Sequence, residues 1–219
     1  MNTPSASDIL SRLSRLAHHE QIILSGLAIC VGGIGGGAAV AFREAIGFFQ
    51  SIFYGVSHER LPSHAVSLEW WHLLLAPVVG GLIVGLVVRF LLPGQRPHGV
   101  ADVVEASAMR GGRLRIGSGL GAALVSAVSL GCGGSAGREG PVVHLAAALS
   151  SFFARRVGLG RSLGQTLLGC GVAAGVAASF NAPFAGIFFA LEVVTGNYAM
   201  ASFTPVVIAS VTGTLVSRA

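Results

Sequence analysis

Long apolar stretches alternate with short polar ones along this chain, and their lengths predict its helices. A helix needs about 20 apolar residues to cross a bilayer, and residues 22–42 and 72–92 reach that length. The first of these continues as a mixed helix to about residue 56. A polar segment, residues 95–115, follows and contains a short helical piece at 101–109. The later apolar stretches are shorter, at residues 116–130, 142–153, 163–179, 184–194 and 203–216.

Stretches this short do not fit upright spans, and they predict tilted and broken helices that end at membrane depth. Irregular backbone is tolerated there only where protein buries it or where it lines a watery cavity. The chain has 32 glycines, and small residues four positions apart let two helices pack closely. Such pairs are Gly33/Gly37, Gly81/Gly85, Gly117/Gly121 and Gly171/Gly175. We therefore expect an all-α membrane protein.

The composition of the chain supports the same class. Hydrophobic residues make up 53% of the 219 residues and charged residues 11%, whereas a soluble domain has about 25% charged residues. The net charge is +5, and all 14 basic residues are arginines. They lie at the ends of apolar stretches, which is typical of topology determinants rather than of a nucleic-acid surface. The absence of lysine favours a bacterial source, and we expect a multi-pass protein of the bacterial inner membrane.

The N-terminal segment, residues 1–20, is polar and amphipathic, and it lacks the apolar core of a signal peptide. We expect a helix on the cytoplasmic surface of the membrane there, followed by a membrane domain at residues 21–219. Cys30, Cys132 and Cys170 are far apart within apolar stretches, so we interpret them as packing residues. The sequence indicates no metal site and no cofactor.

One polar turn lies between two uncharged stretches, residues 116–132 and 141–154, and it contains Arg138 and Glu139. A carboxylate at membrane depth costs about 2.5–3.5 kcal/mol even on lenient insertion scales, so it is usually kept for a function. The glycines around it end one helix, and Pro141 suits the first turn of the next, where its missing N–H is not needed. Unpaired N–H groups and the helix dipole make such a start a site for an anion.

Two segments of the chain carry recognisable motifs. Residues 137–141 read Gly-Arg-Glu-Gly-Pro, and residues 177–187 read Ala-Ala-Ser-Phe-Asn-Ala-Pro-Phe-Ala-Gly-Ile. They resemble the GREGP motif and the AAFNAP-L-AGI stretch of the CLC family of voltage-gated chloride channels and chloride/proton antiporters. Their order and separation also agree. The resemblance implies a CLC-type bundle of tilted and broken transmembrane helices, which conducts anions near the membrane midplane within a homodimer.

The resemblance covers the first of the two inverted halves of that family. The second half of the family supplies a GxFxP-type motif and an anion-coordinating tyrosine, and neither is found in these residues. We therefore expect that the chain is a fragment or one half of an assembly. It then needs the missing C-terminal half for a complete chloride pore.

The resemblance also assigns roles to the residues of the charged turn. Glu139 matches the gating glutamate, whose carboxylate occupies the outer anion site and leaves when it is protonated or displaced by chloride. Gly137, Arg138, Gly140 and Pro141 match the rest of this anion-binding helix start.

A second anion-binding segment matches the family less closely. Residues 97–102, Pro-His-Gly-Val-Ala-Asp, stand where the family has GSGIPE. His98 occupies the position of the anion-coordinating serine, and a histidine there introduces pH sensitivity. The backbone N–H groups of Gly99 and Val100 remain candidates for contact with the anion.

Glu192 and Val193 bear on the type of transport. Glu192 aligns with an acid common to channels and exchangers, and it is either part of a proton path or a structural acid that binds backbone N–H groups. Val193 stands where exchangers typically carry their internal proton-transfer glutamate. Because valine carries no proton, a voltage- or pH-gated chloride channel is favoured. The alternative is a chloride/proton antiporter that lacks the usual internal glutamate.

Other interpretations of these residues stay open. The turn at Arg138 and Glu139 is alternatively a solvated surface loop between two ordinary spans. His98 is alternatively a side chain at the membrane interface that binds no ligand. His144 fits a packed or hydrogen-bonded residue better than a functional one. A remote alternative to a non-enzymatic transport protein is an intramembrane serine hydrolase, with Ser135 as nucleophile and His144 as base.

Overall fold

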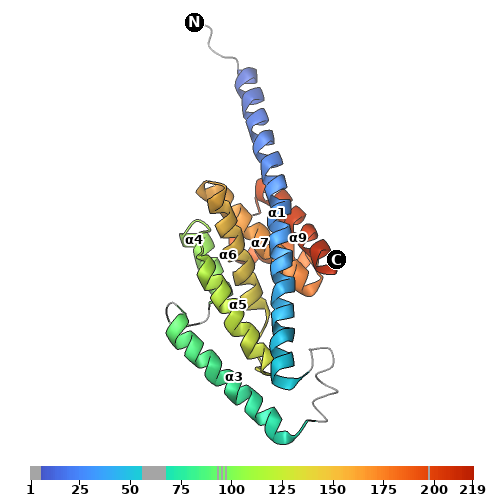
Figure 1. The fold of residues 1–219 in the computed structure, drawn as a ribbon. Coiled ribbons are helices and arrows are strands. Elements are labelled where there is room, and N and C mark those ends of the chain that lie inside the picture. Colours follow the sequence, from blue (N-terminus) through green and yellow to red (C-terminus); the bar gives the residue numbers. More distant parts are fainter. Residues whose placement is uncertain (1–5, 56–67, 93, 95, 97, 197) are drawn as a thin grey trace.

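The computed structural model describes residues 6–55, 68–92, 94, 96, 98–196 and 198–219, with the backbone alone for residues 6–20 and 91. The loop predicted around residues 58–64, and Pro97, lie outside the described residues. The helices follow one another as α1 (Ala6–Tyr54), α3 (Trp70–Leu91), α4 (Val100–Met109), α5 (Ile116–Gly131), α6 (Glu139–Arg156), α7 (Arg161–Phe180), α8 (Pro183–Phe188), the π-helix η2 (Phe189–Thr195) and α9 (Met200–Arg218) (Figure 1).

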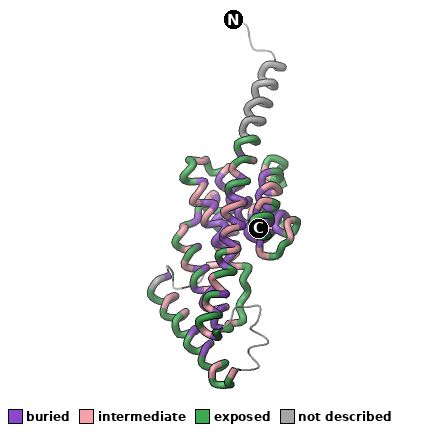
Figure 2. Tube along the Cα trace, turned by 45° about the vertical axis from the view of Figure 1, so that its right-hand side comes forward, coloured by how far each residue is buried: buried purple, intermediate pink, exposed green. Residues whose placement is uncertain are grey.

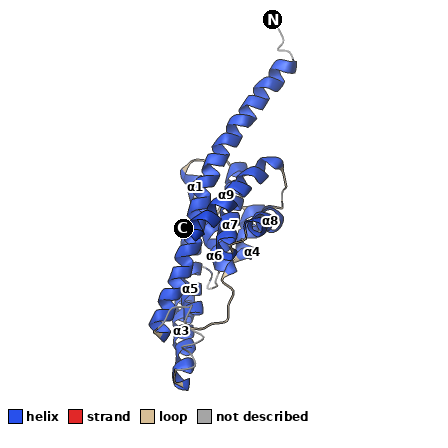
Figure 3. Cartoon of the chain, turned by 90° about the vertical axis from the view of Figure 1, so that its right-hand side faces the viewer, coloured by secondary structure: helices blue, strands red, loops and turns tan. Residues whose placement is uncertain are grey.

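The apolar stretches predicted from the sequence all correspond to helices, and the described residues contain no strand (Figure 3). The bounds differ by a few residues. α6 begins at Glu139, three residues before the predicted start, so that Pro141 lies within its first turn. The boundary expected at residue 20 does not appear as a break in the helix, because α1 runs continuously from Ala6 to Tyr54.

Helix α7 forms the centre of the fold and packs against α1, α6 and α9 (Figure 1). Its side chains Leu167, Leu168 and Val172 are fully buried. In an apolar stretch of 18 residues, 72% of α7 is buried inside the protein, whereas only 11% of α3 is. Helix α3 contacts α5 and leaves large apolar side chains on the outside (Figure 2).

Helices α1, α3, α7 and α9 are long and apolar enough to cross a membrane. Their lengths explain the exposed apolar surface of α3, since lipid covers such a surface in a membrane protein. Cys132 and Cys170 are buried as expected, but Cys30 is exposed on α1 and does not pack in the core.

The break expected between residues 179 and 184 is present. α7 ends at Asn181, which has the left-handed conformation that commonly closes a helix (φ 53°). Pro183 then begins α8, which continues directly into η2. Gly196 ends η2 in the left-handed region, with φ 60°. The chain therefore enters and leaves this segment through two sharp turns.

Glycines create the closest approach between α1 and α9. A Cβ on Gly36 would lie 2.7 Å from the carbonyl oxygen of Gly213, and a Cβ on Gly32 would lie 2.7 Å from that of Ala209. Two backbones can approach so closely only where no side chain separates them. The glycine stripe at Gly32 and Gly36 thus fixes how α9 lies along α1.

The predicted glycine pairs are only partly correct. On α7, Cβ atoms at Gly171 and Gly175 would meet α6 at Ser150 and Ala146, so this pair is confirmed as a packing site. Five of the predicted glycines, in contrast, have no neighbour within 4 Å of an added Cβ, namely Gly33, Gly37, Gly81, Gly85 and Gly117. The predicted pair Gly33/Gly37 lies one residue beyond the observed stripe at Gly32 and Gly36. Because successive helical residues differ by about 100° in direction, the predicted pair is on another face of α1.

Substituting adjacent glycines tests this arrangement. Gly36→Ala should lower the free energy of unfolding by about 1–3 kcal/mol, because overpacking forces α1 away from α9. Gly37→Ala is the matched control, since it adds the same methyl group where no atom lies within 4 Å. It should be neutral or slightly stabilising, as alanine favours helix over glycine. Thermal unfolding in detergent, followed by circular dichroism, measures both, and equal midpoints would contradict the α1–α9 contact.

Candidate functional site

The charged turn predicted from the sequence lies at the start of α6, with Arg138 as its N-cap residue and Glu139 as its first helical residue. The turn, residues 137–139, is exposed on this chain, whereas residues 141–148 are buried. An α-helix cannot bind its own first N–H groups, and Pro141 has none. The N–H groups of Arg138, Glu139 and Gly140 are therefore the donors that this helix start offers.

The Glu139 side chain turns back toward the loop before the helix. Its Oε2 lies 2.5 Å from where a Cβ of Gly137 would be, so the carboxylate occupies the space that a side chain at position 137 would need. A larger residue at position 137 would require this flexible carboxylate to move. The carboxylate therefore lies over the loop that leads into α6.

An open hollow of about 400 Å³ lies next to Glu139 and connects it with α1. The hollow is lined by Arg138 and, from α1, by Arg43 and Gln50. Gln50 is buried, and its Oε1 has no hydrogen-bond partner among the described residues. Arg43 makes only a long, exposed contact with Glu44, at 3.9 Å, which is worth little in energy. Two guanidinium groups thus border the approach to Glu139.

Helix α6 is held in place at both ends. Before it, the Tyr54 hydroxyl donates to the carbonyl of Cys132 at 2.7 Å, and the Gly134 N–H donates to the carbonyl of Ser129 at 2.8 Å. At its far end, Arg155 donates to the carbonyl of Leu114 at 2.6 Å. These contacts fix the direction in which the helix start points.

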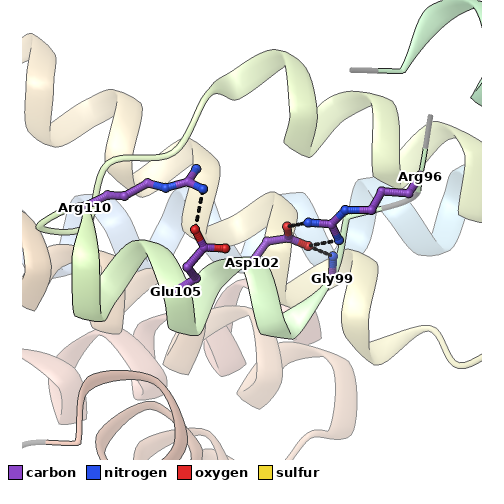
Figure 4. Close-up of polar contacts among 5 residues, drawn as sticks. All are labelled: Arg96, Gly99, Asp102, Glu105 and Arg110. Atoms are coloured by element: carbon purple, nitrogen blue, oxygen red, sulfur yellow. Dashed lines mark hydrogen bonds and ion pairs between the residues drawn. The ribbon is translucent and has the colours of Figure 1, made fainter. Parts of the chain in front are cut away.

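The start of α4 is the second candidate anion site, and the structure fills one of its donors. The Gly99 N–H donates to Asp102 Oδ2 at 2.9 Å, and Arg96 Nη2 donates to Oδ1 at 2.7 Å (Figure 4). The carboxylate of Asp102 therefore takes the place that an anion would occupy at the Gly99 N–H. The expectation that the Gly99 N–H is available to an anion does not fit the structure. Val100 is the first residue of α4, and contact between its N–H and an anion stays a prediction.

The charge state of Asp102 follows from the same contacts. Burial by itself favours the neutral acid, but the bond from Gly99 and the neighbouring charges of Arg96 and His98 lower the pKa of Asp102 below its ordinary value. The ionised form consequently stabilises the fold at neutral pH. That contribution is lost as the pH falls through the lowered pKa.

His98 and His144 bring the two helix starts together. Their rings stack with centroids 5.5 Å apart and planes inclined by 12°. His144, which lies just over one turn along α6 from Glu139, has no exposed surface. Three of the ring nitrogens have no hydrogen-bond partner among the described residues: His98 Nδ1 and both nitrogens of His144. His144 is thus packed but not hydrogen-bonded, and sequence analysis gave no sign that it meets His98.

The remaining candidate acid, Glu192, lies on an exposed face of η2. It forms a hydrogen bond with Tyr198, a residue that the sequence analysis did not select. No backbone N–H of the described residues is found to donate to Glu192, and the structural role expected for it stays a prediction. Val193 beside it is also exposed.

Residues 80–219 match the sequence profile of a family described as voltage gated chloride channel. The chain belongs to that family. The ClcB-like protein of Ralstonia nicotianae is 34% identical over 201 residues, which are 90% of this chain and 46% of the relative. A voltage-gated ClC-type chloride channel ClcB of Escherichia coli is 36% identical over 194 residues, or 88% and 46% of the two chains. The chain therefore spans about half the length of the curated relatives it matches.

Solved structures agree with this family membership. The chain superposes on a CLC-type fluoride/proton antiporter with a TM-score of 0.71 and 26% identity, covering 91% of this chain and 47% of the other. The chain also superposes on a slow cyanobacterial Cl⁻/H⁺ antiporter with a TM-score of 0.72, covering 89% of this chain and 46% of the other. Its 19% identity supports the fold alone. The fold is thus the first of the two inverted halves of a CLC protein.

Family membership also excludes the serine hydrolase alternative, because CLC proteins are channels and transporters rather than enzymes. The structure is consistent with that exclusion. Ser135 is exposed, whereas the His144 ring is buried against His98 and has no hydrogen-bond partner in the described part of the chain.

The contacts of Asp102 lead to a stability prediction. Asp102→Ala should lower the free energy of unfolding by about 1–2 kcal/mol at neutral pH, because it removes charged hydrogen bonds at a partly buried helix start. Glu105→Ala is the control: it breaks the exposed Glu105–Arg110 pair of the same helix (Figure 4) and should cost less than about 0.5 kcal/mol. Thermal melts in detergent between about pH 2.5 and pH 7 measure both, because the contribution of the carboxylate is lost only below the ordinary aspartate pKa of about 3.9. An Asp102→Ala deficit that does not shrink at low pH would contradict the role of the ionised carboxylate.

Proposed function

We propose that this chain forms the first half of a chloride pathway across the bacterial inner membrane and that Glu139 gates it. The observation that supports the proposal is the position of the Glu139 carboxylate, which turns back over Gly137 at the start of α6. An ionised carboxylate there occupies the place of an anion. A protonated one no longer competes for the N–H groups, and chloride enters.

The chemistry of the helix start suits an ion that must bind and leave. N–H groups and about half a positive charge from the helix dipole attract an anion without the full charge of a fixed cation. Conduction requires binding that is weak enough for release. The backbone of Arg138, Glu139 and Gly140 provides these groups, and Pro141 lies in the first turn.

The arginines beside the hollow support an anion entrance. Arg43 and Arg138 line the hollow that leads to Glu139, and a cleft lined by one sign of charge raises the local concentration of the opposite ion. The guanidinium groups are thus placed to gather chloride before it reaches the helix start.

Passive conduction is the form of transport that we favour. Val193 occupies the position after Glu192 and offers no group that binds a proton. The alternative is a chloride/proton antiporter without that internal acid, and one observation favours it: the two solved structures described above are of antiporters. In that case the acid nearest in the sequence to the missing internal glutamate is Glu192, which is exposed and lies beside Tyr198.

Completion of the pathway requires a second, inverted half and, in our proposal, a second subunit. Large apolar side chains remain exposed on α8 and α9, among them Phe184 (75%), Phe188 (52%) and Leu215 (64%). These helices lie at the end of the chain that packs on α7. Such surfaces are available to the second half and to a homodimer partner. A chain with only the first half is expected not to conduct.

The gating role of Glu139 is tested by chloride flux from proteoliposomes that contain the completed protein. Glu139→Ala should remove most of the pH dependence, because no carboxylate then competes with chloride for the helix start. Glu139→Gln should behave alike, since it resembles the protonated acid. Glu105→Gln, an exposed acid on α4, is the control and should retain the pH response of the unmodified protein. An unchanged pH response in Glu139→Ala would contradict the assignment.

The type of transport is tested in the same vesicles. A chloride gradient should drive no uphill proton movement, because residue 193 binds no proton, and flux should follow the chloride gradient alone. A pH-sensitive dye inside the vesicles measures the protons. The variant Val193→Glu places an acid at position 193 and shows whether that position can then couple proton movement to chloride flux. Proton pumping by the unmodified protein would identify an antiporter and overturn the channel interpretation.

A further inference from the structure

The ends of four helices meet at one end of the bundle, away from the charged turn at Glu139. The turn after α4 contacts the start of α7, since a Cβ on Gly111 would lie 3.1 Å from Arg161 Cγ. The end of α6 meets the start of α5, where Arg155 donates to the carbonyl of Leu114. Figure 1 shows the turn after α4 beside the turn between α6 and α7. We call the surface formed by these four helix ends the basic end.

The basic end carries a formal charge equal to the net charge of the whole chain. It contains six of the 14 arginines and one of the nine acids, which gives +5, and the other eight arginines and eight acids cancel. Its acid, Glu105, already pairs with Arg110 (Figure 4). The remaining arginines form no ion pair within the described part of the chain; they are Arg113, Arg115, Arg155, Arg156 and Arg161. Their charge is therefore not balanced by these residues.

Three of these arginines line one small pocket, which we call the basic pocket. Arg113, Arg155 and Arg161 border it together with Ser151 and Gly160. Its volume is about 30 Å³, whereas one water molecule needs roughly 10–15 Å³ of such space. A group of the size of a phosphate therefore fits, and anything attached to that phosphate extends outside the pocket.

The chemistry of the basic pocket favours a phosphate. Guanidinium groups bind phosphate oxygens through paired, charged hydrogen bonds. Arg155 is held by its Nη1, which donates to Leu114 and Ser151, so its position is fixed before a ligand arrives. The start of α7 adds support, because its N-cap residue Gly160 has no side chain to bind the free N–H groups.

The position of the basic end favours a lipid as the source of this phosphate. Helix α7 is long and apolar enough to cross a membrane and begins at Arg161, so the basic pocket lies at a membrane surface. Exposed apolar side chains flank the arginines: Met109 is 77% exposed and Val157 47%. Such neighbours suit acyl chains, whereas a soluble phosphate does not need them. Basic residues at helix ends mark the cytoplasmic side, whose leaflet contains anionic lipids.

We propose that the basic pocket binds the phosphate of an anionic phospholipid in the cytoplasmic leaflet, with Arg113, Arg155 and Arg161 as its ligands. Arg113 belongs to the segment between α4 and α5, and Arg161 to α7. One bound phosphate therefore joins two segments that are distant in the sequence. The inference is independent of the proposed gating by Glu139, because it concerns only how the fold is held at the membrane surface.

Lipid titration of the completed protein in a neutral detergent tests the proposal. The probes are dihexanoyl phosphatidylglycerol, which is anionic, and dihexanoyl phosphatidylcholine, which has no net charge. At about 0.15 M salt, where charges more than about 8 Å apart are largely screened, we expect saturable binding of the anionic lipid and at least about ten-fold weaker binding of the neutral one. Microscale thermophoresis measures both.

Arginine variants locate the binding site. Arg113→Gln and Arg161→Gln should each weaken binding of phosphatidylglycerol about five-fold, the contribution of one basic residue near an anionic headgroup. Arg161→Lys keeps the charge and the stem that packs over Gly111, so it should restore most of the binding. Arg156→Gln is the matched control, because Arg156 lies over the Phe152 ring, 5.0 Å from its centroid, and does not line the basic pocket. It should weaken binding less than about two-fold.

Three results would overturn the inference. Equal binding of the two lipids would show that the arginines only orient the chain in the membrane. Equal losses in Arg156→Gln and Arg113→Gln would indicate diffuse surface charge instead of a site. Displacement of phosphatidylglycerol by an equal concentration of inorganic phosphate would identify a site for a soluble anion. Melting temperatures without lipid show which variants fold, and Arg113→Gln decides the question if Arg161→Gln does not, because Arg113 is exposed.

Discussion

A helix that starts within a membrane presents N–H groups that its own turns cannot bind, and this constraint governs the structure around the candidate site. The two starts that meet in this chain solve it differently. At α4 the helix supplies its own acceptor, because Asp102 reaches back to the Gly99 N–H. At α6 the acid lies at the first position, and its carboxylate bends over Gly137. The first arrangement is fixed by Arg96, whereas the second leaves an acid that a proton or an anion can displace.

Such a site needs a rigid support, and the small residues provide it. Helix α7 lies at the centre and meets α6 through Gly171 and Gly175. Helix α9 lies against α1 where Gly36 faces Gly213. Backbones in direct contact cannot slide or rotate without collision. The direction of α6 is thus set by van der Waals contact on one side and by the Arg155 hydrogen bond at its end.

The distribution of charge is consistent with weak anion binding. The arginines that line the hollow, Arg43 and Arg138, border the approach to Glu139 and not the buried part of α6. Deeper in the chain the positive character comes from helix starts. A permanent cation at that depth would bind an anion too tightly for transport.

The sequence by itself determined the helices, because apolar runs between Gly, Pro and charged residues set where each helix begins and ends. It also indicated the charged turn at Glu139 and the break before Pro183, since both depend on neighbours in the chain. Tertiary structure decided the rest. The stripe at Gly36 rather than Gly37, the capture of the Gly99 N–H by Asp102 and the stacking of His98 on His144 depend on which faces meet. Periodicity predicts that a helix forms, but only the packing of all helices decides which face of it is covered.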